Sequence, residues 1–245
     1  MSSSLPTHRP RSLAVRIALV TVALVAVGGA PSAVAADRAY AMDLGRRSDF
    51  VAQSNFVQCV GASMQMMLNM TRPGADRTAT TQRTLQRLAR TWSGPNRLGR
   101  ARQGASVRGW SIGLNLMGAG PYQVVGTDTL DEAMLMAARA IRSTGRPVGL
   151  LVWRGRHAWV MSGFRSTRDP LVAGARVTRA IVEDPLHPHG STVWGPSPAP
   201  GQALTMAEVG RQFVPRRSSA LAGSLSGQYV LVLPYEFDVR VLRTR

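Results

Sequence analysis

Residues 148–164, with the sequence VGLLVWRGRHAWVMSGF, decide the fold of this chain. Two apolar runs, residues 148–153 and 157–164, flank a short arginine-glycine-arginine segment at 154–156. Apolar runs of this length on either side of a glycine-containing tight turn are typical of two antiparallel strands. The stretch therefore predicts a β-hairpin in which His157 begins the second strand.

A third strand is predicted over residues 177–183, after a polar loop. If it returns beside the second strand, pairing residue 164 with about residue 178 brings His157 to the level of Asp184. A carboxylate in that place can accept a hydrogen bond from one imidazole nitrogen, fix its tautomer and stabilise the imidazolium. The hairpin arithmetic therefore selects Asp184 as the partner of His157.

Helical patterns precede these strands. Residues 59–70 are apolar almost all round, which predicts a buried helix. Helices followed by a run of antiparallel strands define an α+β arrangement, and one domain is expected over residues 51–245. Residues 105–120 are rich in glycine and ambiguous. The further elements expected are an amphipathic helix over 78–92, a capped helix from 129 to about 143, a short capped helix from 205, and a strand over 229–233.

The N-terminal residues have the pattern of a secretory leader. Three arginines precede an apolar run over residues 17–29, and Ala-Val-Ala at 33–35 is typical of a cleavage site. The apolar run is shorter than the ~20 residues that a membrane-spanning helix needs, so no stable anchor is expected. We expect a signal peptide over residues 1–35, an N-terminal arm over 36–50, and a secreted mature protein that is extracellular or associated with the cell wall.

The composition excludes two classes of protein. Of 245 residues, 44% are hydrophobic, which is ordinary for a globular domain and too high for a disordered chain. A single cysteine cannot form an internal disulfide, so a disulfide-stapled miniprotein is excluded as well. The net charge of +17 comes entirely from arginine, because no lysine is present. A charge of that origin partly reflects codon composition, so it is a weak guide to function.

The lone Cys59 is the first candidate for chemistry. In an oxidising compartment an unpaired thiol is either deeply buried or retained for its reactivity. Cys59 lies where a polar segment meets the buried helix, and free N–H groups with the positive end of a helix dipole favour a thiolate there. His157 is the candidate general base, since His187 and His189 lie in a proline-broken loop. Gln53, six residues before the cysteine, can donate to an oxyanion together with the Cys59 amide.

This order of residues resembles a known family. A glutamine six residues before a cysteine that opens a buried helix, a histidine on a later strand (HAWVMSGF) and an Asp-Pro after the next strand (AIVEDP) are similar to the C39-like branch of the papain-like cysteine peptidases. The resemblance implies a papain-like fold, in which the cysteine helix packs on an antiparallel sheet that carries the histidine and the aspartate. It also implies Cys59 as nucleophile, His157 as base and then acid, Asp184 as orienting carboxylate and Gln53 as oxyanion donor.

Two departures from the family pattern leave the substrate open. The nucleophile lies in Gln58-Cys59-Val60, with the glycine one position later than in many relatives, and the loop between the histidine and aspartate strands is long. The resemblance implies a peptide or protein substrate and no cofactor or metal. An anionic cell-wall polymer is a further expected partner, nucleic acid is not, and the protein is expected to be a monomer.

Three other interpretations remain open at this stage. The same site can act as a peptidoglycan amidase or endopeptidase or as an acyltransferase, or the fold can serve as a binding module without turnover. A zinc site built from His157, Asp184, His187 and His189 is a further alternative, although the spacing is not that of common zinc motifs. Trp153, Trp159 and Trp194 are candidates for the lining of an apolar cleft.

Overall fold

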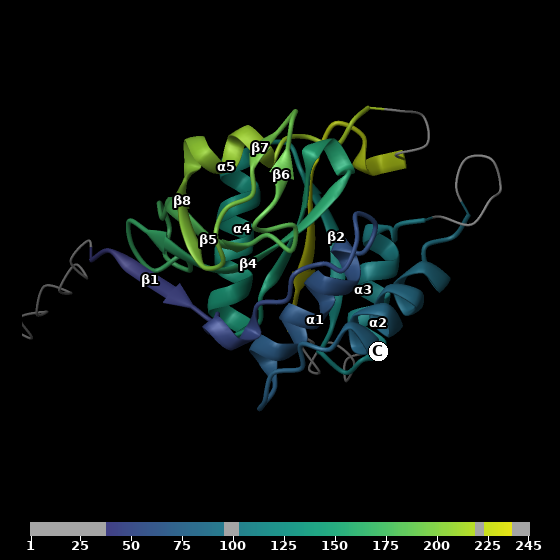
Figure 1. Cartoon of the computed structure of the whole chain (residues 1–245). Helices are drawn as coiled ribbons and strands as arrows, with labels where there is room; N and C mark the ends of the chain where they lie inside the picture. The colour runs from purple at the N-terminus through teal and green to yellow at the C-terminus, as the bar shows by residue number, and fades with distance from the viewer. Residues whose placement is uncertain (1–37, 96–102, 219–222, 237–245) are drawn as a thin grey trace, which may run out of the picture. The chain divides into compact units, whose positions relative to one another are not determined.

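The hairpin predicted from residues 148–164 is present in the computed structural model of the chain (Figure 1). Strand β3 (Val148–Val152) pairs antiparallel with β4 (His157–Ser166), and Val152 faces His157. The connecting turn, η2 (Trp153–Gly155), holds Trp153 and Arg154 at φ values of 57° and 55°. These two non-glycine residues adopt the left-handed conformation in the turn that leads to His157.

The structure describes residues 38–95, 103–218 and 223–236. All of them belong to one compact unit that spans residues 37–245. The signal peptide expected over residues 1–35 lies outside the described residues. In the described part of the chain, no helix is both long and apolar enough to cross a membrane.

One antiparallel sheet carries the fold, as expected for an α+β protein. Its strands lie in the order β2-β9-β3-β4-β5-β8, and β1 pairs with β4 outside this path. The expected strand over 229–233 forms and lies inside the sheet between β2 and β3, whereas β2 was not predicted. A separate two-stranded hairpin joins β6 (Gly190–Ser191) to β7 (Gly195–Pro196). The remaining strands are β2 (Tyr122–Thr127), β5 (Val177–Glu183), β8 (Gln202–Thr205) and β9 (Tyr229–Pro234).

The segment interpreted as an N-terminal arm contributes to the sheet. Strand β1 (Tyr40–Asp43) pairs with the far end of β4, where Met42 faces Phe164 and Asp43 faces Gly163. A single turn, η1 (Arg47–Asp49), follows. No period is visible in this segment, because a four-residue edge strand is too short to show one.

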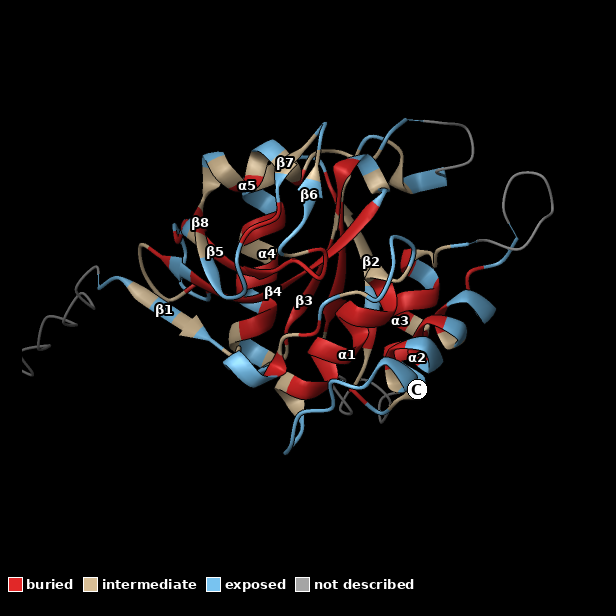
Figure 2. Cartoon of the chain, in the orientation of Figure 1, coloured by how far each residue is buried: buried red, intermediate tan, exposed pale blue. Residues whose placement is uncertain are grey.

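Helices cover both faces of the sheet. Alternate residues of β4 separate the two cores: Ala158 and Val160 pack with α1, α2 and α3, whereas Trp159 and Met161 pack with α4. Figure 2 shows α1 buried along most of its length and α2 with one exposed side. The helices are α1 (Cys59–Thr71), α2 (Ala79–Thr91), α3 (Val107–Leu116), α4 (Leu130–Thr144) and α5 (Met206–Gln212).

The ambiguous stretch at 105–120 forms α3, and its glycines are there for packing. A Cβ atom at Gly109 would lie 2.0 Å from the backbone oxygen of Ala89, and one at Gly113 would lie 2.6 Å from the methyl carbon of Met64. The missing side chains therefore let α3 approach α2 and α1 closely. Glycine lowers helix propensity, which is why the sequence pattern alone did not reveal the helix.

We predict that Gly109→Ala destabilises the protein by about 1–3 kcal/mol, because the added methyl group forces α2 and α3 apart. The matched control is Gly104→Ala, whose Cβ would meet only the Val57 oxygen at 3.9 Å. This control should change the free energy of unfolding by less than about 0.5 kcal/mol or raise it slightly. Urea unfolding of both variants measures the difference, and equal stabilities would contradict the close helix packing.

Candidate functional site

Cys59 is the first residue of α1 and is partly exposed. The following ten residues, Val60 to Asn69, are all buried. Gln58 at the N-cap position makes no side-chain hydrogen bond to the helix. The Gly61 N–H of this first turn is instead bound by Gln86 Oε1 at 2.8 Å, so the start of the helix carries a partly exposed thiol beside N–H groups that Gln58 does not cap.

The helix is aligned with the histidine strand one turn further on. Ser63 lies one turn after Cys59, and its Oγ donates to the backbone oxygen of Ala158 at 3.4 Å. Ala158 is the neighbour of His157 in β4. Packing of Val60 and Met64 against Ala158 and Val160 continues the same contact. The docking of α1 on β4 is thus what brings the cysteine to the histidine.

His157 is held on two sides. Its Nε2 lies 2.7 Å from Asp184 Oδ1, and both side chains are almost completely buried. The ring stacks on the indole of Trp153, with centroids 4.2 Å apart and planes 25° apart. The bond to Asp184 occupies Nε2, so Nδ1 is the nitrogen left for Cys59.

The charge state of His157 follows from these neighbours. Burial alone would lower the pKa of His157, but hydrogen bonds to Asp184 and Cys59, together with the negative charge of both partners, raise it from 6.5 to about 9. The imidazolium is therefore the favoured form at neutral pH. A protonated histidine hydrogen-bonded to a thiol can stabilise a thiolate and later donate its proton.

Asp184 lies just beyond the end of β5 and is fully buried. Its Oδ1 also accepts the Leu186 N–H at 2.8 Å, and its backbone oxygen accepts from His187, so a tight turn fixes the carboxylate. A buried carboxylate without partners would be very costly. The two hydrogen bonds to Oδ1, from His157 and from the Leu186 N–H, therefore also stabilise the fold. The predicted juxtaposition of Asp184 and His157 is present.

The predicted strand register was wrong in detail. Residue 164 faces Ala180 instead of a residue near 178, because irregularities in β4 between Met161 and Gly163 and between Arg165 and Ser166 shift the pairing. A bulge of this kind leaves no clear trace in an apolar strand. Asp184 still reaches His157, since it lies in the turn after the strand and not in the ladder.

Gln53 lies on the loop before α1 and is tied to the aspartate. Its backbone N–H donates to the Pro185 oxygen at 2.7 Å, and its side-chain Nε2 donates to the Asn55 oxygen at 2.9 Å. An amide NH₂ has two protons, so one donor of Gln53 remains for a substrate oxygen. The structure thus brings Gln53 next to the Asp184–Pro185 segment, with part of its donor capacity engaged by its own loop.

Two buried glutamines of α2 hold this loop, and sequence reasoning missed them. Gln82 accepts from the Ser54 N–H and Oγ, both at 2.7 Å, and donates to the Ala52 oxygen at 2.9 Å. Gln86, one turn later, accepts from the Gly61 N–H and donates to the Val57 oxygen, both at 2.8 Å. The sequence did contain a signal for this role: Gln82 and Gln86 are uncharged, lie four residues apart and fall on the apolar side of α2.

Of the other sequence candidates, Trp153 lies at this site, because it stacks on His157. Trp159 is fully buried and lines no hollow with Trp153 and Trp194, so it was wrongly included with them. His187 packs edge-on against Phe50, and His189 is exposed. In the described ranges, no three His, Cys, Asp or Glu side chains are grouped so as to hold a metal ion.

The assembled group has the parts that acyl transfer requires. Cys59 could supply a nucleophile, His157 a proton donor and acceptor, Asp184 an orienting carboxylate, and Gln53 and the helix start N–H donors. Comparison with known proteins adds nothing to this: no protein-family model matches the chain, and no curated protein matches it significantly. The resemblance in sequence order therefore remains a prediction.

We predict that the His157 imidazolium stabilises the folded protein in a defined pH range. Its pKa is raised above the unfolded value of 6.5, so the contribution is fully present below pH 6.5 and is lost as the pH rises through about 9. The measurement is the free energy of unfolding of the wild type minus that of His157→Gln. This difference should fall between pH 6.5 and 9, and a constant difference would contradict the raised pKa.

We also predict that Gln86→Met lowers the free energy of unfolding by about 1–3 kcal/mol, since the Gly61 N–H and the Val57 oxygen lose their partner. The neighbouring Arg87→Met is the control, because Arg87 is exposed and its effect should remain within about 0.5 kcal/mol. Denaturant unfolding compares the two. A Gln86 variant as stable as the Arg87 variant would show that the loop does not depend on this bond.

Proposed function

We propose that this protein is a secreted cysteine peptidase with a papain-like fold, similar to the C39-like branch. The observation that carries the proposal is the buried pair of His157 and Asp184, whose side chains lie 2.7 Å apart, with Cys59 close enough to His157 to contribute to its raised pKa. A core histidine with a merely structural role would not require a partly exposed thiol on one side and a buried carboxylate on the other. The packing of the cysteine helix on an antiparallel sheet supports the papain-like arrangement.

In the proposed mechanism, the Cys59 thiolate attacks the carbonyl carbon of the scissile bond. A C–S bond forms, and the carbonyl electron pair moves to the oxygen, where the Cys59 N–H and the remaining Gln53 donor stabilise the negative charge. His157 Nδ1 then gives its proton to the leaving amine as the C–N bond breaks, which leaves a thioester.

Hydrolysis of the thioester reuses the same groups. The now neutral His157 accepts a proton from water, and the hydroxide attacks the thioester carbonyl. The C–S bond breaks, the carboxylic acid product leaves, and the thiolate–imidazolium pair is restored. Asp184 keeps Nε2 protonated throughout, so Nδ1 always faces the reacting atoms.

The mature chain would act outside the cell on peptide or protein substrates. This part of the proposal rests on the leader pattern in residues 1–35 and on the lone cysteine. In the proposed mechanism, water is the acceptor of the acyl group. No cofactor takes part in it.

We predict that Cys59→Ala lowers the hydrolysis of casein or of a mixed peptide library by at least about 10³-fold, since the covalent step is lost. Asp184→Asn should fall between this variant and the wild type, because its amide cannot stabilise the imidazolium. The control is Ser197→Ala, a buried hydroxyl outside the chain of catalytic groups. Release of new amino termini measures the rate.

The contrary outcomes are distinct. Equal rates for wild type and Cys59→Ala would exclude the mechanism. If neither cuts peptides but the wild type reduces the turbidity of purified cell walls, the substrate is a wall cross-link. Failure of Cys59 to react with iodoacetamide at neutral pH, together with no turnover, would favour a binding module.

A further inference from the structure

A basic hollow of about 410 Å³ lies beside the catalytic histidine. Three separate segments meet in it: the turn between β3 and β4, the tip of the β6–β7 hairpin, and the chain after α5. The Arg217 N–H donates to the Arg154 oxygen at 3.3 Å, which joins two of these segments. The lining residues are Trp153, Arg154, Arg156, Val193, Trp194 and Arg217.

Trp153 connects this hollow to the chemistry. Its indole forms part of the wall and also stacks on the His157 ring at 4.2 Å. Its Nε1 donates to Gln212 Oε1 at 2.9 Å, and Gln212 Nε2 donates in turn to the Pro196 oxygen at 3.2 Å. The indole is therefore held in one orientation between α5 and the histidine, and a group bound in the hollow lies one ring away from His157.

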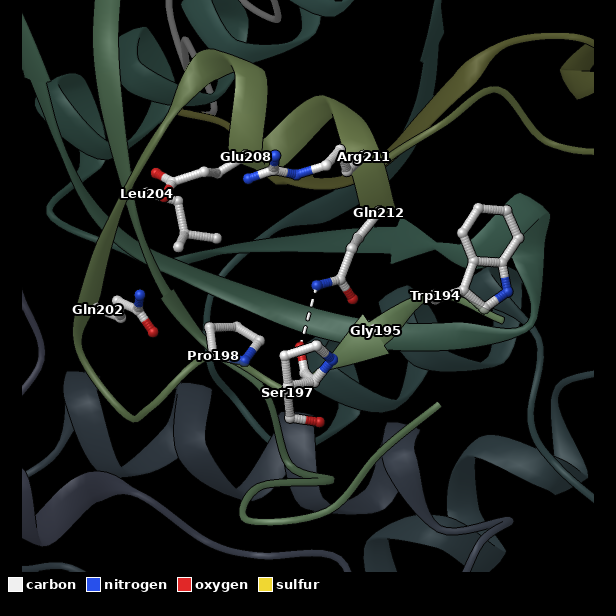
Figure 3. Close-up of a pocket in the computed structure, with 10 residues that line it drawn as sticks. Trp194, Gly195, Ser197, Pro198, Gln202, Leu204, Glu208, Arg211 and Gln212 are labelled. Carbon is white, nitrogen blue, oxygen red and sulfur yellow. Dashed lines mark hydrogen bonds between the residues drawn. The ribbon is translucent and has the colours of Figure 1, made fainter. Parts of the chain in front are cut away.

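A neighbouring hollow differs from the first in the charges of its lining residues. Figure 3 shows this second hollow, with Trp194 on one side and Gln212 above, and with the dashed hydrogen bond of Gln212 to the Pro196 oxygen. It shares Trp194 with the first hollow, but its lining includes both Glu208 and Arg211. Opposite charges balance there, whereas the hollow at Trp153 has three arginines and no acidic residue.

The three arginines lack carboxylate partners. Arg154, Arg156 and Arg217 are exposed, and none of the ion pairs found among the described residues involves them. The left-handed backbone at Trp153 and Arg154 places two of these side chains on a strained turn. Strain of about 1–3 kcal/mol per residue persists where the surroundings or the function require that conformation.

We propose that this hollow binds a carboxylate of the substrate, namely an acidic side chain on the leaving-amine side of the scissile bond. The inference rests on the proposed function and adds a substrate class to it. We infer the side from the proposed mechanism, because His157 protonates the leaving amine and Trp153, which stacks on His157, also forms part of the wall of the hollow. Planar guanidinium groups bind carboxylates in pairs, and the two indoles cover the apolar part of the side chain.

The first experiment measures binding without turnover. Labelled Ala-Ala-Glu-Glu-Ala-Ala and Ala-Ala-Gln-Gln-Ala-Ala peptides are titrated onto the full chain carrying Cys59→Ala, and fluorescence anisotropy gives Kd. The Glu peptide should bind about tenfold more tightly, and less so at high salt. The preference should disappear when Arg154→Gln, Arg156→Gln and Arg217→Gln are added.

The matched control removes the same charge elsewhere. Arg83→Gln, Arg87→Gln and Arg90→Gln alter three exposed arginines on α2 that do not line the hollow, and the preference should survive. Equal binding of the two peptides to the parent protein would overturn the proposal. Equal loss of the preference in both triple variants would overturn it as well, because the effect would then be one of net charge alone.

The second experiment locates the acid relative to the cut. Cleavage sites of the wild type in a mixed peptide library, identified by mass spectrometry, should be enriched in Asp and Glu after the scissile bond, and the triple variant of the hollow should lose this enrichment. Cleavage without an acidic preference overturns the hollow and leaves the peptidase intact. A binding preference without any cleavage supports the hollow and contradicts the proposed function.

Discussion

The buried pair of Asp184 and His157 is the interaction on which the site depends. A fully buried carboxylate must be paired, and Asp184 satisfies this need with one ring nitrogen and one backbone N–H. The end of β5, the start of β4 and the turn at Leu186 are thereby held at one point. Pro185, next in the chain, accepts from Gln53, so the loop before the cysteine helix is attached to the same point. The same contacts of Asp184 and His157 therefore stabilise the fold and orient the groups of the proposed site.

The second support of the site comes from α2, which contributes no reactive group. Its two glutamines form hydrogen bonds with two backbone N–H groups and two backbone oxygens in the loop over residues 52–57 and in the first turn of α1. These bonds fix the backbone of a mostly exposed loop and pair its polar groups where the loop meets α2. The site is thus built in layers: reactive side chains, a loop that orients them, and a helix that fixes the loop through neutral amides.

Much of this could be predicted from the sequence, for definite physical reasons. Strong apolar runs bounded by turn residues revealed β3, β4 and β5, and the capping residues Thr129 and Thr205 revealed the starts of α4 and α5. The contact of Asp184 with His157 was predicted correctly although the strand register was not. Asp184 lies in the turn after β5, where an error of one or two residues in the register does not move it out of reach of His157. The bulge in β4, strand β2 and the close packing of α3 depend on contacts distant in sequence, and no local pattern encodes them.

The position of β9 in the sheet has a consequence for how the protein matures. This strand follows every other described strand in the chain, yet it lies between β2 and β3. Because a chain is synthesised from its N-terminus, Cys59, His157 and Asp184 are made before the strand that completes their scaffold. Until that last strand arrives, β3 lacks one neighbour and the hairpin bearing His157 lacks its support. The site can therefore reach its final geometry only after residues 229–234 have joined the sheet.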